Sequence, residues 1–89
     1  MSLKSQRMRG EWEIILDLLS ATAKNKNEKK TYIMQSAYLQ WKIFNKYFTY
    51  LIEKGLVEKI NSDEDNFELT EKGDELLGLL KKVDKILKK

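Results

Sequence analysis

Apolar residues recur every three or four positions between residues 30 and 56, with one short interruption. Before the interruption, Ile33, Met34 and Ala37 fall on one face of a short helix. After it, the same spacing predicts a longer second helix, whose apolar residues are Phe44, Tyr47, Phe48, Leu51 and Ile52. Gly55, which readily adopts a left-handed backbone, follows this second helix. Two helices joined by a tight turn are the pattern of a helix-turn-helix.

The opposite side of the second helix is polar and partly basic. It carries Gln40, Trp41, Lys42, Asn45, Lys46 and Thr49. A polar face of this kind, opposite a packed face, suits a helix that enters the major groove of DNA. An ordinary solvated surface has the same pattern, so the periodicity leaves both interpretations open.

The remainder of the chain adds one helix before this pair, and a hairpin and a helix after it. Apolar residues at helical spacing predict a first helix over residues 11–23, and the polar segment 24–29 predicts an exposed loop. Alternation over residues 56–60 and a short run at 67–69, separated by a polar turn, predict a β-hairpin. Thr70 is a good N-cap for a final helix that runs nearly to the end. The predicted fold is mainly α, in the order α-α-α-β-β-α.

The final helix has more apolar surface than one face of a small domain usually buries. Its seam, at spacings of four, three and four residues, consists of Leu76, Leu80, Val83 and Leu87, and Leu77, Leu79 and Ile86 widen it. The surplus predicts a homodimer joined through this helix as a short coiled coil. Folding of the helix back onto its own core is the alternative interpretation.

Length and composition bound what the chain can do. Its 89 residues make one small domain, with no cysteine and no histidine. Those absences exclude disulfides, cysteine–histidine zinc sites, and nucleophilic sites that use a thiol or an imidazole base. The carboxylates form no paired arrangement, so enzymatic activity is not expected, and neither is a metal or a cofactor. No apolar run is long enough to span a bilayer and no signal peptide is apparent, which predicts a soluble, cytoplasmic protein.

Basic charge is concentrated in the half of the chain that holds the helix pair. The net charge is +3. Residues 1–30 carry seven basic and four acidic residues, residues 31–60 carry four and two, and residues 61–89 carry six and eight. This distribution is typical of the electrostatic footprint of nucleic-acid binding. Arg7 and Arg9 are candidates for phosphate contacts, with a solvated terminus as the alternative.

Short motifs follow one another in a fixed order from the first helix to the last. They are Trp12-Glu13-Ile14-Ile15-Leu16-Asp17-Leu18-Leu19, Thr31-x-Ile33-Met34-x-x-Ala37-x-Leu39, Tyr47-Phe48-x-x-Leu51-x-x-x-Gly55-Leu56-Val57 and Leu69-Thr70-x-Lys72-Gly73-x-Glu75-Leu76-Leu77. In this order and spacing they resemble the archaeal winged helix-turn-helix proteins of the small chromatin-associated or transcription-regulator type. The resemblance extends from about residue 11 to residue 80.

The resemblance implies a winged helix-turn-helix that binds double-stranded DNA, commonly as a dimer joined through C-terminal helices in an antiparallel coiled coil. In that picture the recognition helix runs from about Gln40 to Lys54. The chain is accordingly expected to consist of a basic arm at 1–10, a winged-helix domain at 11–70 and a dimerisation helix at 71–89. Three features depart from the pattern. Gln40 is a poorer cap than the small residue usual there. The wing tip at 62–65 carries three carboxylates, which a phosphate backbone repels, and the last helix is short for a dimerising coil.

For DNA binding, the residues expected at the interface are Lys30, Gln40, Trp41, Lys42, Asn45, Lys46 and Thr49. Lysines of the second helix are expected at phosphates or base edges, and the Gln40 and Asn45 amides at bases. Trp41 either stacks on the sugar backbone or forms a partly buried flank of the helix pair. Winged helices also bind proteins, and Tyr38, Trp41 and Tyr50 suit a partner surface. The alternative is therefore a protein-protein interaction module without DNA binding. A DNA-binding chain would act as a transcriptional regulator or a chromatin-associated protein on the nucleoid.

Overall fold

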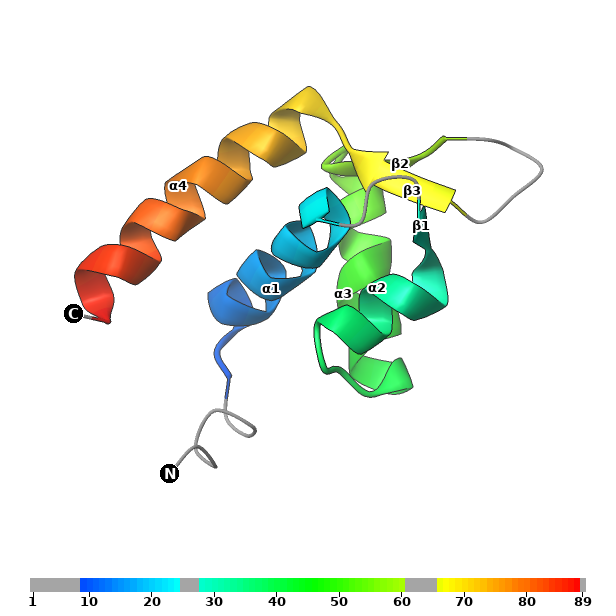
Figure 1. The fold of residues 1–89 in the computed structure, drawn as a ribbon, viewed down its shortest axis with the longest axis horizontal. Coiled ribbons are helices and arrows are strands. Elements are labelled where there is room, and N and C mark those ends of the chain that lie inside the picture. The colour runs from blue at the N-terminus through cyan, green and yellow to red at the C-terminus, as the bar shows by residue number, and fades with distance from the viewer. Residues whose placement is uncertain (1–8, 25–27, 61–65, 89) are drawn as a thin grey trace.

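The structure, a computed structural model, describes residues 9–24, 28–60 and 66–88. Its elements in chain order are α1 (Glu11–Lys24), β1 (Glu28–Lys29), α2 (Lys30–Ser36), α3 (Trp41–Glu53), β2 (Val57–Lys59), β3 (Asn66–Leu69) and α4 (Glu71–Leu87). Figure 1 shows their arrangement. The order confirms the predicted three helices, hairpin and final helix, and it adds the short strand β1.

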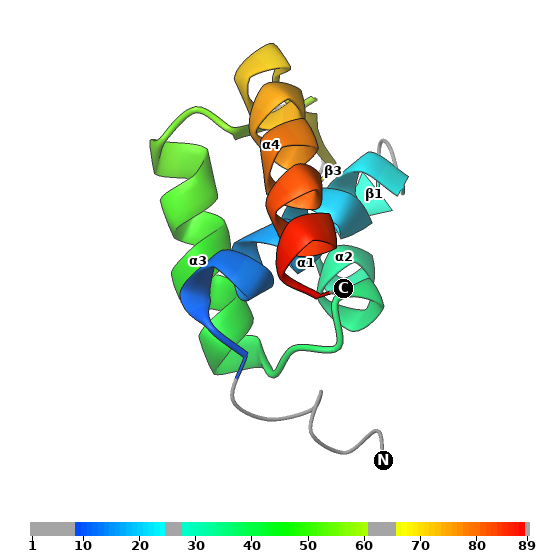
Figure 2. The same cartoon turned by 90° about the vertical axis from the view of Figure 1, so that its left-hand side faces the viewer.

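Helix α1 is the central element of the fold. It lies between α4 on one side and the α2–α3 pair on the other, and α4 runs back along it in the opposite direction (Figures 1 and 2). Its buried apolar residues are Ile14, Leu16, Leu18, Leu19 and Ala21. Thr22 is buried among them, and its hydroxyl donates to the Leu18 carbonyl at 2.8 Å, so the polar group has a partner inside the core.

The helix pair packs on α1 through apolar residues that its periodicity predicted. The buried ones are Ile33, Ala37, Phe44, Phe48 and Leu51. Phe44 and Phe48 stack with ring centroids 4.8 Å apart, and Phe48 meets Phe67 of β3 edge to face at 5.1 Å. This row of rings joins α3 to the sheet. Ile52, which the pattern placed on the packed face, is 38% exposed because it lies at the margin of that face.

The three strands form an antiparallel sheet in the order β1-β3-β2. In the hairpin, Val57 pairs with Leu69. On the other edge of β3, Glu28 pairs with Phe67. The prediction of an exposed loop over residues 24–29 is therefore wrong at both ends. Lys24 is the last residue of α1, and Glu28 and Lys29 become a strand by pairing with β3, while residues 25–27 lie outside the described residues. The acidic wing tip predicted at 62–65 lies outside the described residues.

The start of α4 is fastened to the end of α3. Thr70 caps α4 as predicted: its hydroxyl accepts the Gly73 amide at 3.0 Å and donates to the Gly55 carbonyl at 2.6 Å. Gly55 has a φ of 73°, the left-handed conformation expected after α3. Lys72 also reaches back, donating to the Lys54 carbonyl at 3.2 Å. These contacts fix where the last helix begins relative to the helix-turn-helix.

The apolar surface of α4 is divided between its own core and solvent. Leu77 is buried, and Leu76 and Leu80, two members of the predicted dimer seam, are half-buried against the core. The remaining seam residues, Val83 and Leu87, are exposed, as are Leu79 and Ile86. The apolar contacts of α4 with its own core therefore lie along its first half, and the apolar side chains of its second half are exposed.

Candidate nucleic-acid interface

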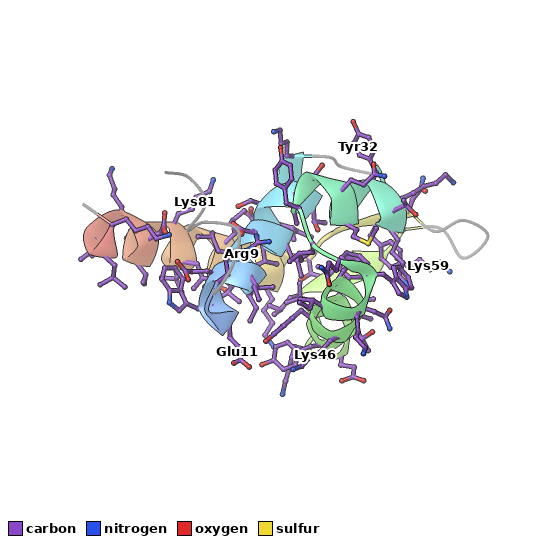
Figure 3. All side chains as sticks on the ribbon, turned by 90° about the horizontal axis from the view of Figure 1, so that it is seen from below. Arg9, Glu11, Tyr32, Lys46, Lys59 and Lys81 are labelled. Atoms are coloured by element: carbon purple, nitrogen blue, oxygen red, sulfur yellow. The ribbon has the colours of Figure 1, made fainter. Side chains whose placement is uncertain are left out.

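Helix α3 presents one side to solvent along its whole length. The exposed residues include all six predicted for this face, namely Gln40, Trp41, Lys42, Asn45, Lys46 and Thr49. At about 100° per residue, Lys42, Lys46 and Thr49 lie opposite the buried Phe44 and Phe48. The structure thus brings the predicted α3 residues together on one outward face, which Figure 3 shows at Lys46.

Lys30 joins this face at its N-terminal end. It begins α2, is half-buried, and places its ammonium 6.0 Å from the centre of the Trp41 ring. Trp41 itself leans on Phe44, with ring centroids 5.9 Å apart, yet remains 55% exposed. Trp41 is therefore a partly exposed flank of the helix pair, in contact with both Phe44 and Lys30.

Gln40 precedes α3 with an extended backbone, and its side chain makes no capping hydrogen bond. Its carbonyl accepts the Phe44 amide at 2.9 Å, which starts the helix. Its exposed side-chain amide therefore plays no part in starting the helix. This geometry agrees with its being the poorer cap that the sequence indicates.

Positive charge on α3 is confined to its first two turns and its end. Lys46 lies over the Tyr47 ring at 5.3 Å, and the tyrosine hydroxyl donates to Glu11 of α1 at 3.4 Å. Lys54, just past the helix, lies over Tyr50 at 5.7 Å. Glu53 is exposed on the same side as the lysines of the first turns and places one negative charge there. The basic part of the face is its N-terminal part.

The guanidinium of Arg9, which the sequence offered as a candidate phosphate contact, is bound within the fold. Its guanidinium forms an ion pair with Asp17 of α1. The same group donates to the Ala37 carbonyl at 3.1 Å and to the Tyr38 carbonyl at 2.9 Å, both in the turn between α2 and α3. Because its three acceptors lie on α1 and in the turn between α2 and α3, Arg9 links these two parts of the fold. Arg7, the other candidate in the arm, lies outside the described residues.

Within residues 9–24, 28–60 and 66–88, no group of three or more acidic, cysteine or histidine side chains could hold a metal ion. Over the same part of the chain, no helix is both long enough and apolar enough to cross a membrane.

The exposed second helix of the pair, with an antiparallel hairpin beside it and a helix after it, defines a winged helix-turn-helix. The chain belongs to the winged helix-turn-helix family, which it matches over residues 8–88.

Its relatives include archaeal proteins. MJ0287, an uncharacterized protein of Methanocaldococcus jannaschii, is 35% identical over 79 residues, which cover 89% of this chain and 77% of the relative. MJ0290, an uncharacterized protein of the same organism, is 38% identical over 74 residues, 83% of this chain but 33% of the relative. The crystal structure of Sso10a-2, a DNA-binding protein from Sulfolobus solfataricus, is similar with a TM-score of 0.77 at 27% identity, covering 90% of this chain and 83% of that one. These matches confirm the predicted resemblance to archaeal winged-helix proteins.

Proposed function

We propose that this chain binds double-stranded DNA by placing α3 in the major groove. The observation that carries the proposal is the outward face of α3, where Lys42 and Lys46 lie opposite buried phenylalanines. Lysines on such a face neutralise phosphates, and the exposed Gln40 and Asn45 amides can hydrogen-bond base edges. Membership of the winged helix-turn-helix family and the similarity to a DNA-binding protein of known structure support the same proposal.

A homodimer joined through α4 is part of this proposal, in the role of a transcriptional regulator or a chromatin-associated protein. The apolar side chains exposed on the second half of α4 support it. A two-fold dimer that binds one duplex would address half-sites about 34–36 Å apart or a multiple of that distance.

Fluorescence-anisotropy titration against a random-sequence duplex, first at low and then at moderate salt, tests DNA binding. We expect affinity that falls steeply as salt rises. In the variant Lys42→Ala/Lys46→Ala, the slope of log affinity against log salt should become shallower by roughly two units if both lysines contact phosphate. Circular dichroism should be unchanged because neither side chain is buried.

The matched control is Lys81→Ala/Lys82→Ala, which removes the same charge from an exposed part of α4. Figure 3 shows Lys81 well away from Lys46. We expect this control to keep a slope close to that of the unmodified chain. Equal losses in both double variants would mean that affinity follows net charge and that α3 is not the interface. No binding even at low salt would contradict the DNA proposal.

A second candidate function is a protein-protein interaction module without DNA binding. The large exposed aromatic residues favour it, since Tyr38 is 88% and Tyr50 43% exposed, and tyrosine is enriched at protein interfaces. Binding through such apolar surfaces depends little on ionic strength. A partner whose binding survives high salt, together with no DNA binding, would support this function.

A further inference from the structure

The turn between α2 and α3 has an unusual backbone. Tyr38 has a φ of 55°, a left-handed conformation that side chains with a β-carbon disfavour. The residue before it, Ala37, is the C-cap of α2, so its carbonyl is among those without a partner inside the helix. The turn is held in part by its own backbone bonds, from the Tyr38 amide to the Gln35 carbonyl at 3.0 Å and from the Leu39 amide to the Met34 carbonyl at 3.3 Å. Contacts from outside the turn can add to these bonds and offset the strain at Tyr38.

Arg9 supplies contacts on both sides of the strained residue. One guanidinium nitrogen donates to the Ala37 carbonyl and the other to the Tyr38 carbonyl. These two carbonyls belong to the peptide planes immediately before and after the Tyr38 α-carbon. Holding both planes fixes the backbone rotation at Tyr38, and the ion pair to Asp17 fixes the guanidinium to α1.

The direction of α3 follows from this turn. Helix α3 begins at Trp41, three residues after Tyr38, so a rotation at Tyr38 is carried into the whole helix. Another polar link from the start of α1 to α3, Tyr47 to Glu11, is long at 3.4 Å and exposed. The side chains proposed to touch DNA are carried on α3, so a change in its direction moves them relative to the rest of the domain.

We infer that Arg9 is a positioning residue, which sets the orientation of α3 by fastening the α2–α3 turn to α1 and does not itself contact DNA. The inference rests on the proposed DNA-binding function. This role differs from the phosphate contact that the sequence suggested for Arg9.

The decisive variant is Arg9→Lys, titrated with the same random-sequence duplex over the same salt range. Lysine keeps the positive charge but lacks the planar fork that serves three acceptors. We expect an affinity about three- to tenfold lower at each salt concentration, with the salt slope unchanged. Lys42→Ala is the comparison, because loss of one phosphate contact makes the slope shallower by about 0.9.

Amide hydrogen exchange on the same variant separates positioning from general destabilisation. The Leu39 amide donates to the Met34 carbonyl across the turn at 3.3 Å and reports on the turn, whereas the Leu77 amide reports on α4. In Arg9→Lys, we expect faster exchange at Leu39 and an unchanged rate at Leu77. Equal acceleration at both amides would show a merely structural role and overturn the inference.

One binding result would also overturn the inference, namely wild-type affinity in Arg9→Lys. If Arg9→Ala then shows a slope shallower by about one, Arg9 is a phosphate contact. If the unmodified chain binds no duplex at low salt, the proposed function fails and so does the DNA-positioning role. Exchange at Leu39 would then still decide whether Arg9 holds the turn.

Discussion

Gly73 determines how closely the start of α4 approaches the backbone that precedes β2. It is the third residue of α4 and faces the backbone of Leu56, just before β2. A β-carbon at position 73 would stand 2.0 Å from the Leu56 carbonyl oxygen and 3.0 Å from its carbonyl carbon. That oxygen also accepts the Thr70 amide at 3.1 Å. It is therefore held in place by the same junction that an added methyl group would push apart.

We predict that Gly73→Ala lowers the free energy of unfolding by about 1–3 kcal/mol, because the added carbon overpacks a contact with backbone. Gly78→Ala is the matched control within the same helix. Nothing lies within 4 Å of a β-carbon at Gly78, and alanine there should stabilise the helix by up to about 1 kcal/mol. Urea unfolding measures both changes. Two variants that shift stability in the same direction would contradict the close approach at Gly73.

At the scale of the element, the last turn of α4 is held on α1 by an ion pair. The Lys88 ammonium lies 2.9 Å from the Glu13 carboxylate and 3.4 Å from that of Asp84, and 6.0 Å from the Trp12 ring centre. Hydrogen bonds from Lys88, and then from the Gly10 amide, lower the pKa of Glu13 below its ordinary 4.5. The same bond to Glu13 raises the pKa of Lys88 above its ordinary 10.5.

These pKa shifts predict how the end of α4 responds to pH. Folding lowers the Glu13 pKa, so its stabilisation is present above pH 4.5 and is lost as the pH falls through the lowered value. The Lys88 pKa is raised, so its contribution is present below pH 10.5 and is lost above it. Acid should therefore loosen the last turn of α4 from α1, at a cost below about 1 kcal/mol for so exposed a pair.

An NMR titration of the Glu13 side-chain carboxyl carbon measures this effect. Lys88→Ala should move the Glu13 midpoint back toward 4.5, whereas Lys85→Ala, on an exposed neighbour in the same turn, should leave it in place. A midpoint that does not respond to Lys88→Ala would show that the ion pair does not form in solution.

Helices could be predicted from the sequence because their periodicity comes from the residues that pack. The outward face of α3 was predictable for the same reason, since it is the complement of the packed face. Strand β1 was not, because Glu28 and Lys29 are polar and become a strand only by pairing with an edge of β3. The role of Arg9 was equally hidden. Its turn partners are 28 and 29 residues away and are backbone carbonyls, which every residue has. Which residues of the α3 face contact DNA stays a prediction.

At the scale of the whole molecule, the outer side of α4 carries apolar side chains that the described chain leaves exposed. Leu79, Val83 and Ile86 are 55%, 39% and 72% exposed and are spaced by four and three residues, so they form one stripe. The packing of Leu76 and Leu80 on their own core shifts the proposed interface outward from the seam that the sequence indicated.

We predict that the chain is a dimer in sedimentation equilibrium at micromolar concentration, and that Leu79→Lys/Ile86→Lys is a monomer because the charges interrupt the stripe. Both side chains are exposed, so circular dichroism of the variant should show a retained fold. The Lys81→Ala/Lys82→Ala variant should remain a dimer. A monomeric wild-type chain would remove α4 as a dimerisation element.

Because α1 packs against α4, and α4 is synthesised later, one side of α1 is uncovered for part of synthesis. Helix α1 ends at Lys24 and α4 begins at Glu71, with the helix-turn-helix and the hairpin between them. At typical elongation rates of 5–20 residues per second, α4 follows α1 out of the ribosome after about 2–9 s. During this time the helix pair and then the hairpin emerge, and the side of α1 that holds Trp12 lacks its cover. For a few seconds, chaperones or another nascent copy of the chain can therefore bind the side of α1 that α4 covers in the finished fold.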